Sequence, residues 1–545
     1  MLIHLKGGRI IDPANERDEI SDLWIRDDRI VAAPLGGATA DETVDAGGLI
    51  IMAGGIDIHS HIAGSNVNTA RLLLPEQHRS HARRADATPL SNAGWSTFET
   101  GCLYAEMGFT TVVEPAVSPQ YALQAHLELA DIPIIDKAIL AILGNDDFLL
   151  GLMRSGEDAS VIRDYVAWTL HSTRALGVKV INAGGVAAFK ENLRSFSFDD
   201  IVPWYGVTSR EIIKGLQRAV HDLGVPHPLH VHCNNLGIAG NFETALTTIS
   251  AAEDLPLHLA HLQFYGYAAE GRQGFSSGAP QLAEAINAAK NVTIDVGQVM
   301  FGQTVTISSD VLRQFSARGQ ASPKKYVIFD GDSNGGGVVP YEYKAGSFFN
   351  AVQFAVGLEL FLLINDPWRV FFTTDHPNGA PFTTYPELFA LLMDKDLRAQ
   401  SLLRLPEEAA AMTTLPSLTR EYTLYEVATM TRAAPAKLLG LSDRGHLGVG
   451  GRADIALYRP GKDLAQMFRS AAQVYKDGDL VVRDGAVTHY RFGRTLQVSP
   501  GVDAAMQRRM SEYCDARYGL ASNFMRVPDG AIPRPQPFET IGCAS

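Results

Sequence analysis

Short apolar runs recur through the middle of the chain, and each is followed by a longer stretch rich in helix-forming residues. About eight such runs stand out: IIMAGGIDIHSH, TTVVEPA, IPIIDKAILAI, GVKVIN, PLHVHC, PLHLAHL, NVTIDVGQV and RVFFTTD. Apolar runs are typical of strands buried on both faces, and helical stretches between them are typical of crossovers in a parallel sheet. The alternation therefore predicts an α/β fold, a TIM-like (β/α)8 barrel.

The two ends of the chain show short alternating segments separated by turns, a pattern typical of antiparallel strands. IHLKGGRIIDP is an example from the first end, and GHLGVGGRADIALYRP is one from the second. We expect these ends to pair into one small composite β-sandwich. The predicted parts are residues 1–52 (first part of the sandwich), 53–420 (barrel), 421–495 (second part) and 496–545 (C-terminal extension).

Two segments are longer than this plan requires. Residues 300–369 exceed one crossover and predict a lid or a partner-binding excursion. Within them, FFNAVQFAVGLELFLLIND is interrupted by polar residues, which indicates a buried helix instead of a membrane span. Residues after about 500 include the proline-rich VPDGAIPRPQPFE and predict either a tail that wraps a neighbour or a poorly ordered terminus.

Composition narrows the function classes. With 47 basic and 60 acidic side chains the net charge is -13, which argues against a general binder of nucleic acid or anionic membranes. The 4 cysteines are widely spaced and form no CxxC pair, and Met1 leads into a predicted strand instead of a signal peptide. We therefore expect a cytoplasmic protein without a transmembrane segment.

Metal-binding side chains stand near the C-terminal ends of the predicted strands, where a barrel builds its active site. His59 and His61 are two residues apart on the first strand, so both point to one face and can bind one ion. Alone, this pair is weak evidence for a metal site, because such a pair is more often two histidines that are hydrogen-bonded near a turn. In PLHVHCNN, His230 and His232 share a face, and His232 is the predicted ligand because it lies nearer the strand exit.

The last strands add two further candidates. In PLHLAHL, His258 and His261 have opposite parity, and we select His261 because it lies at the strand exit. Asp375 ends the last strand, directly before a polar loop, where a carboxylate can bind metal and also transfer protons. The alternative for Asp375 is a surface aspartate that caps a turn.

Lys179 lies among apolar neighbours on the fourth strand, where an isolated ammonium is costly. Desolvation lowers the pKa of a lysine and leaves an amine that can react with CO2 to give a carbamate (N6-carboxylysine) that bridges two metals. A lysine paired with a carboxylate is the alternative, and Lys137 is a rival position. Asn182 could supply a neutral oxygen ligand to a single metal if Lys179 stays unmodified.

The order of these residues along the strands resembles that of the amidohydrolase superfamily over residues 1 to about 490. Several stretches resemble more specifically the large hydrolytic subunit of formylmethanofuran dehydrogenase and of the bacterial formyltransferase/hydrolase complex. They are GGIDIHSHIAGSNVNTARLLLPEQHR, YAEMGFTTVVEPAVSP, VKVINAGG, HVHCNNLGIAGN, HLQFYGY and TTDHPNGAPF. Dihydroorotases and hydantoinases tend to carry an acidic residue where this chain has Asn234, so cyclic ureides are a less favoured alternative.

The resemblance implies zinc-dependent hydrolysis of an N-formyl amide on a methanofuran-type C1 carrier, which releases formate, beside other subunits of a complex. An archaeal-type subunit that runs the formylation is an alternative, and so is a scaffold without activity. The candidate substrate-binding residues are Arg71, Asn182, Asn234 and His376. The arginines Arg71, Arg79, Arg83 and Arg84 follow the first metal motif and are expected either to guide an acidic carrier or to form a solvated helix face.

Overall fold

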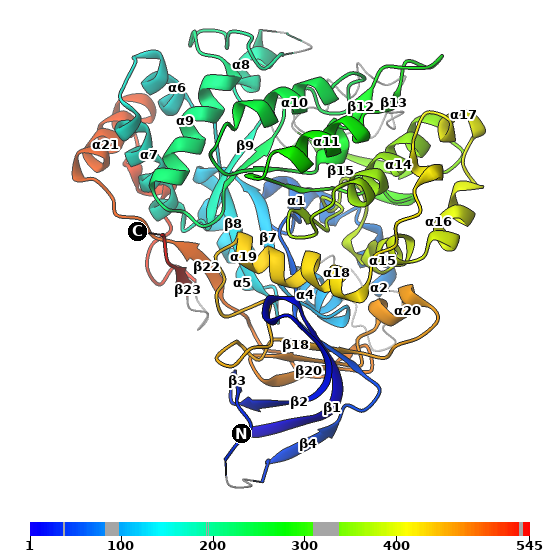
Figure 1. Ribbon diagram of the computed structural model, residues 1–545. Helices are drawn as coiled ribbons and strands as arrows, with labels where there is room; N and C mark the ends of the chain where they lie inside the picture. Colours follow the sequence, from blue (N-terminus) through cyan, green and yellow to red (C-terminus); the bar gives the residue numbers. More distant parts are fainter. Residues whose placement is uncertain are drawn as a thin grey trace.

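A computed structural model describes residues 1–35, 39–81, 97–191, 193, 196–308, 337–532 and 538–544 (Figure 1). Its centre is a curled parallel sheet made from all the strands predicted for the barrel. In the described part these are β6 (Gly55–Asp57), β7 (Phe109–Val117), β8 (Asp136–Leu143), β9 (Gly177–Ile181), β10 (Leu229–His232), β11 (Leu257–Leu259), β14 (Val292–Asp295) and β17 (Val370–Phe371). Each pairs with the next in parallel, and a bridge between Ser60 and His376 connects the first strand to the last. The predicted TIM-like barrel is confirmed.

Helices that follow the strands cover the outside of the sheet. They include α4 (Thr97–Glu106), α5 (Ala122–Ala130), α6 (Asp147–Arg154), α7 (Ala159–Thr173), α8 (Gly185–Lys190), α9 (Ser209–Asp222), α10 (Phe242–Ala251), α11 (Ala279–Ala288) and α15 (Tyr385–Met393). Helix α9 shows why they form. Thr208 and Glu211 make a reciprocal capping box at its start, and Ile212, Leu216 and Val220 recur on one face, which is buried against the barrel.

Shorter helices lie in the loops and after the last strand. They are α1 (Ser65–Arg71), α2 (Pro75–His81), α16 (Lys395–Leu402), α17 (Glu407–Ala410), α18 (Leu424–Ala428), α19 (Ala434–Leu438) and α20 (Leu464–Arg469). Helix α1 follows the His59–His61 motif directly and begins at the mouth of the barrel, so the chain leaves the predicted metal site through a short helix. No helix in the described ranges is both long and apolar enough to cross a lipid bilayer.

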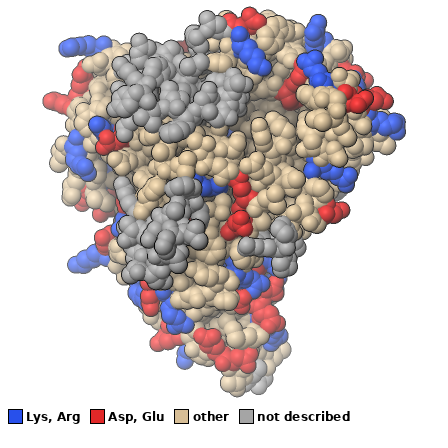
Figure 2. Space-filling model, turned by 180° about the vertical axis from the view of Figure 1, so that it is seen from behind, with Lys and Arg blue, Asp and Glu red and all other residues tan. Residues whose placement is uncertain are grey.

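The two ends of the chain build a second sheet below the barrel. Its N-terminal strands are β1 (Leu2–Asp12), β2 (Arg17–Arg26), β3 (Arg29–Val31), β4 (Glu42–Asp45) and β5 (Ile50–Ala53), and its C-terminal strands are β18 (Ile455–Tyr458), β19 (Gln473–Lys476), β20 (Asp479–Arg483) and β21 (Ala486–Val487). The antiparallel pair β5–β18 joins the two sets, as expected from the matching patterns. This β domain has an apolar core of its own, and acidic and basic side chains are interspersed over it (Figure 2).

The long segment before the last barrel strand contains a hairpin and a helix. Strands β15 (Gly302–Ser308) and β16 (Gly337–Tyr343) pair in antiparallel fashion, and the residues between them lie outside the described ranges. Helix α14 (Phe348–Leu363) is buried along almost its whole length, including Glu359. The prediction of a buried helix in this segment is therefore confirmed.

The C-terminal extension folds back onto the barrel wherever it is described. Strand β22 (Thr495–Val498) pairs with the start of β8, and β23 (Phe538–Ile541) pairs with β22. Helix α21 (Ala504–Tyr518) buries Met506, Met510 and Cys514, and its Gln507 side chain accepts a hydrogen bond of 2.9 Å from the Trp168 indole. The expectation of a poorly ordered terminus is wrong for these residues, because their apolar side chains are buried within the chain. The expectation that the tail wraps a neighbour stays a prediction.

Candidate metal centre

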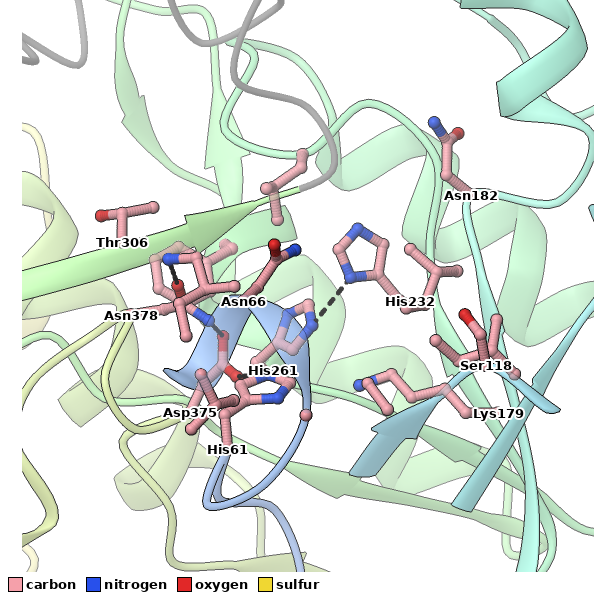
Figure 3. Close-up of a pocket in the computed structure, with 18 of the residues that line it drawn as sticks. His61, Asn66, Ser118, Lys179, Asn182, His232, His261, Thr306, Asp375 and Asn378 are labelled. Carbon is pink, nitrogen blue, oxygen red and sulfur yellow. Dashed lines mark hydrogen bonds and ion pairs between the residues drawn. The ribbon is translucent and has the colours of Figure 1, made fainter. Parts of the chain in front are cut away.

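A cavity of about 300 Å³ opens at the C-terminal ends of the barrel strands (Figure 3). The predicted ligands converge on it from five different strand ends. His61, Lys179, His232, His261 and Asp375 line it directly, and His59 lies fully buried against them. Residues separated by more than 300 positions in the sequence thus share one site.

His59, His61 and Asp375 form the first group of candidate ligands. Asp375 Oδ1 lies 3.0 Å from His59 Nε2 and 3.2 Å from His61 Nε2. One ligand atom from each of the three residues falls within 4.8 Å of the others, a spacing at which one ion can be shared. Burial alone would raise the pKa of Asp375, but His261 and His59 hold it well below its usual value, so the carboxylate stays ionised.

His232 and His261 form the second group, with His232 Nδ1 2.9 Å from His261 Nε2. Burial lowers the pKa of both rings, that of His261 to about 3, so both are neutral and offer lone pairs. The remaining nitrogens, His232 Nε2 and His261 Nδ1, are buried without a hydrogen-bond partner among the described residues. Neutral imidazoles beside an ionised carboxylate are the ligands that Zn²⁺ prefers, so the residues present fit such a metal.

Lys179 lies between the two groups, with its Nζ 3.2 Å from His59 Nε2. Burial lowers the pKa of Lys179 to about 8, although Asp375, Asp295 and Glu114 act against this change. The neutral amine is therefore more populated near physiological pH than it is in an exposed lysine. The rival Lys137 lies at the start of β8 and does not line the cavity.

Two buried carboxylates that the sequence analysis did not select hold the ligands in place. Glu114 on β7 lies 3.1 Å from His61 Nδ1 and accepts hydrogen bonds of 2.6 and 2.9 Å from the backbone amides of Ile62 and Ala63. Burial lowers the pKa of His61, but Glu114 and Asp375 raise it to about 9. A metal cation can displace a proton held between two carboxylates in this way.

Asp295 on β14 supports the other side of the site. It lies 3.1 Å from His59 Nδ1 and accepts a hydrogen bond of 2.7 Å from the backbone amide of His261. His230 Nε2 also contacts His59 Nδ1, at 3.0 Å, and His230 does not line the cavity, so it supports His59 from behind. Asp295 could also form a metal-ligand group with His59 and His230, but it lies beneath the cavity, so we interpret it as the group that orients His59. An acidic residue inside an apolar strand is the signal that could have identified Glu114 and Asp295 from sequence.

The four predicted substrate-binding residues differ in whether they line the cavity. Asn182 lines the cavity, whereas the other three do not. Asn234 is buried and donates a hydrogen bond of 2.8 Å to Ser209 Oγ, and Arg71 is buried and donates to the carbonyl of Ile62. His376 accepts a hydrogen bond of 3.3 Å from the amide of Phe382. These three side chains hold loops around the site. Arg83, Arg84 and the side chain of Arg79 lie outside the described residues.

Comparison with known proteins agrees with this geometry. Residues 42–489 match the amidohydrolase family. The chain is 48% identical over 549 residues to the A component of the formyltransferase/hydrolase complex Fhc of Methylorubrum extorquens, with 100% of both chains covered. It is 38% identical over 517 residues to protein FwdA of Methanocaldococcus jannaschii, which covers 91% of this chain and 90% of FwdA. The crystal structure of the FhcABCD complex from Methylorubrum extorquens with methylofuran matches 100% of both chains with a TM-score of 0.94 and 47% identity.

Proposed function

Since this chain belongs to the amidohydrolase family and is related over its full length to the A component of a formyltransferase/hydrolase complex, we propose that it hydrolyses the N-formyl amide of a methanofuran-type C1 carrier. The observation that carries the proposal is the convergence of His59, His61, His232, His261 and Asp375 on one cavity in such a chain. Formate and the free amine of the carrier would be the products.

The mechanism follows from the ligand set. Zn²⁺ would be held by these residues, and when bound it would make water more acidic and polarise the formyl oxygen as a Lewis acid. Asp375 accepts the proton of the attacking water and passes it to the amine nitrogen as the C–N bond breaks, because an unprotonated amine is a poor leaving group. The imidazoles of His232 and His261 are neutral, so they do not repel a cation. Asp295 and Glu114 hold the rings of His59 and His61 in a fixed orientation.

We further propose that Lys179 reacts with CO2. The neutral amine forms an N–C bond and loses one proton, which gives a carbamate that can serve two metals. The support is the buried Nζ, which lies 3.2 Å from His59, and a pKa lowered to about 8. Carbon-13 NMR after incubation with labelled bicarbonate should show a carbamate signal that is lost in Lys179→Met. An unmodified lysine beside one zinc ion would favour the single-metal site.

The relatives support a proposal about the partners and the direction of the reaction. Identity is 48% to the bacterial Fhc component and 38% to FwdA, which favours the bacterial complex that works in the hydrolytic direction. We propose that the chain acts beside a formyltransferase subunit, with the C1 carrier as the shared group.

Formate release tests the function. The chain purified with its copurifying subunits and loaded with zinc should release formate from the formylated carrier. A preparation that releases none, but opens the rings of dihydroorotate or hydantoin, would show that the chain is a cyclic amidohydrolase. Metal analysis tests the scaffold alternative, because a scaffold would not retain stoichiometric zinc.

A further inference from the structure

The hairpin β15–β16 is hydrogen-bonded to the turn that carries Asp375. Thr304 Oγ1 donates to the carbonyl of Pro377, and Tyr343 donates a hydrogen bond of 3.1 Å to the carbonyl of Asn378. The backbone amide of Ile307 donates a hydrogen bond of 2.7 Å to the side-chain oxygen of Asn378. Both strands of the hairpin are therefore attached to the same turn.

Asn378 connects this hairpin to the carboxylate itself. Its Nδ2 donates a hydrogen bond of 3.0 Å to Asp375 Oδ2 (Figure 3). Asp375 Oδ1 faces His59 and His61 instead. The two carboxylate oxygens thus have different partners. One faces the metal ligands, and the other is held by an amide that is itself held by Ile307.

These contacts matter because neither side chain is oriented by its own rotamer. The terminal torsions of Asp and Asn are broad, so a carboxylate or amide plane is held only by its hydrogen bonds. Asp375 is held through Oδ2, and the Asn378 amide is held through its oxygen. A group that must accept and return a proton works only when it is held close to its productive geometry.

The same hairpin forms one wall of the cavity. Thr306 and Ile307 of β15 and Val339, Tyr341 and Tyr343 of β16 line it. The surface that a substrate would touch is therefore connected to the proton-transferring carboxylate through the Asn378 side chain, beside the two hydrogen bonds from the hairpin to the backbone of the turn.

We propose that Asn378 is a positioning residue for the hydrolysis: it sets the plane of the Asp375 carboxylate relative to the substrate-facing hairpin. The inference rests on the proposed function, because Asp375 needs a defined plane only if it transfers protons. Asn378 lines the same cavity, but its amide nitrogen is directed at Asp375 and its amide oxygen at Ile307, so the role that we assign to it acts through Asp375.

Two substitutions distinguish a role in positioning Asp375 from a role in only holding the hairpin in place. Asn378→Ala removes both side-chain hydrogen bonds, the one to Asp375 and the one from Ile307. Asn378→Asp keeps an oxygen that accepts from Ile307 but replaces the donor to Asp375 with a second carboxylate oxygen. Asn287→Ala is the matched control, because Asn287 also donates to one carbonyl (Leu363, 3.0 Å) and accepts from one amide (Asn365, 3.0 Å), away from the cavity.

The experiment measures formate release from the formylated carrier, zinc content and hydrogen exchange of the Ile307 amide in the purified complex. We expect kcat to fall about 10- to 100-fold in both Asn378 variants, with KM changed less than about threefold and zinc retained. The Ile307 amide should exchange faster in Asn378→Ala and stay protected in Asn378→Asp. Asn287→Ala should keep wild-type kcat.

Three results would overturn the inference. One is near-normal kcat in Asn378→Asp with Ile307 still protected, and another is an equal loss of kcat in Asn287→Ala. The third is loss of zinc in proportion to activity in the Asn378 variants. A wild-type complex that releases no formate would instead overturn the proposed function, so the two failures are distinguishable.

Discussion

Two buried lysines on neighbouring barrel strands show how position, and not burial, distinguishes a site from a structural contact. Lys137 on β8 and Lys179 on β9 are both fully buried. Burial lowers the pKa of both, to about 7 for Lys137 and about 8 for Lys179. By residue type, burial and pKa alone, Lys137 would be the better candidate for an activated amine.

The two lysines differ in the end of the barrel at which they lie. Lys179 pairs in register with Ile142, five residues further along β8 than Lys137, which corresponds to about 16 Å along a strand. Lys137 donates hydrogen bonds to the carbonyls of Ile132 and Gly493, near the place where β22 joins the sheet. The cavity lined by the candidate ligands opens at the C-terminal end, and among the described residues Lys179 lines it and Lys137 does not.

The largest expected effect is a difference in activity and zinc content between variants of the two lysines. Lys179→Met removes the group proposed to hold metal, so we expect formate release to fall about 1,000-fold or more and zinc content to drop. Lys137→Met should keep zinc and wild-type turnover, since Lys137 lies at the other end. Activity and metal analysis of both variants check this, and equal losses would contradict the distinction.

Asp375→Asn tests whether the carboxylate at the cavity transfers the proton. The amide can still offer an oxygen to a metal but cannot accept the water proton, so we expect zinc to be retained while formate release falls about 100- to 10,000-fold. Steady-state kinetics and metal analysis on one preparation measure both effects. Near-normal turnover would remove Asp375 from the proton-transfer role.

Two buried aspartates at opposite ends of the barrel allow a second comparison, for which we expect a smaller loss of activity. Asp295 contacts His59 at the end of the barrel that carries the cavity. Asp136 lies near the opposite end, at the start of β8, 2.8 Å from both Lys476 Nζ and Arg444 Nε. We expect Asp295→Asn to lower zinc affinity or activity about 10- to 100-fold. Asp136→Asn should instead lower the free energy of unfolding, by about 3 to 5 kcal/mol, because it leaves buried cations without their partner.

Zinc titration and thermal unfolding of both aspartate variants test this difference. Asp136→Asn serves as the control for Asp295→Asn, since it removes a buried carboxylate of the same kind far from the cavity. A loss of zinc affinity in Asp136→Asn at temperatures where the protein is folded would contradict the expected pattern.

The smallest effect concerns the pH dependence of stability. Because the pKa of Lys137 is lowered from 10.5 to about 7, the unfolded chain binds the extra proton between these values and the folded chain does not. The contribution of Lys137 to the free energy of unfolding therefore rises with pH over this window, by at most about 1.4 kcal/mol per pH unit. The difference between wild type and Lys137→Met in denaturation from pH 7 to 10 should show this slope, and a constant difference would contradict it.

Much of the fold and of the group of side chains that meet at the cavity could be predicted from the sequence because their signals are local. Runs such as TTVVEPA and PLHVHC mark strands, and His59 and His61 share a face by parity alone. Strand-exit position also selected His232 over His230 and His261 over His258, and only the selected residue of each pair lines the cavity. The sequence could not indicate the partners of Asn234, whose amide is used by Ser209 in a loop.

The sequence by itself determined the barrel, the joining of the two chain ends and which candidate ligands meet at one cavity, since periodicity and strand-end position are properties of neighbouring residues. Only the tertiary structure decided which buried lysine reaches the cavity, that Glu114 and Asp295 orient His61 and His59, and that Asn378 connects Asp375 to the hairpin. These contacts join residues that are mostly far apart along the chain, and hydrogen bonds depend on directions in space that no local pattern records.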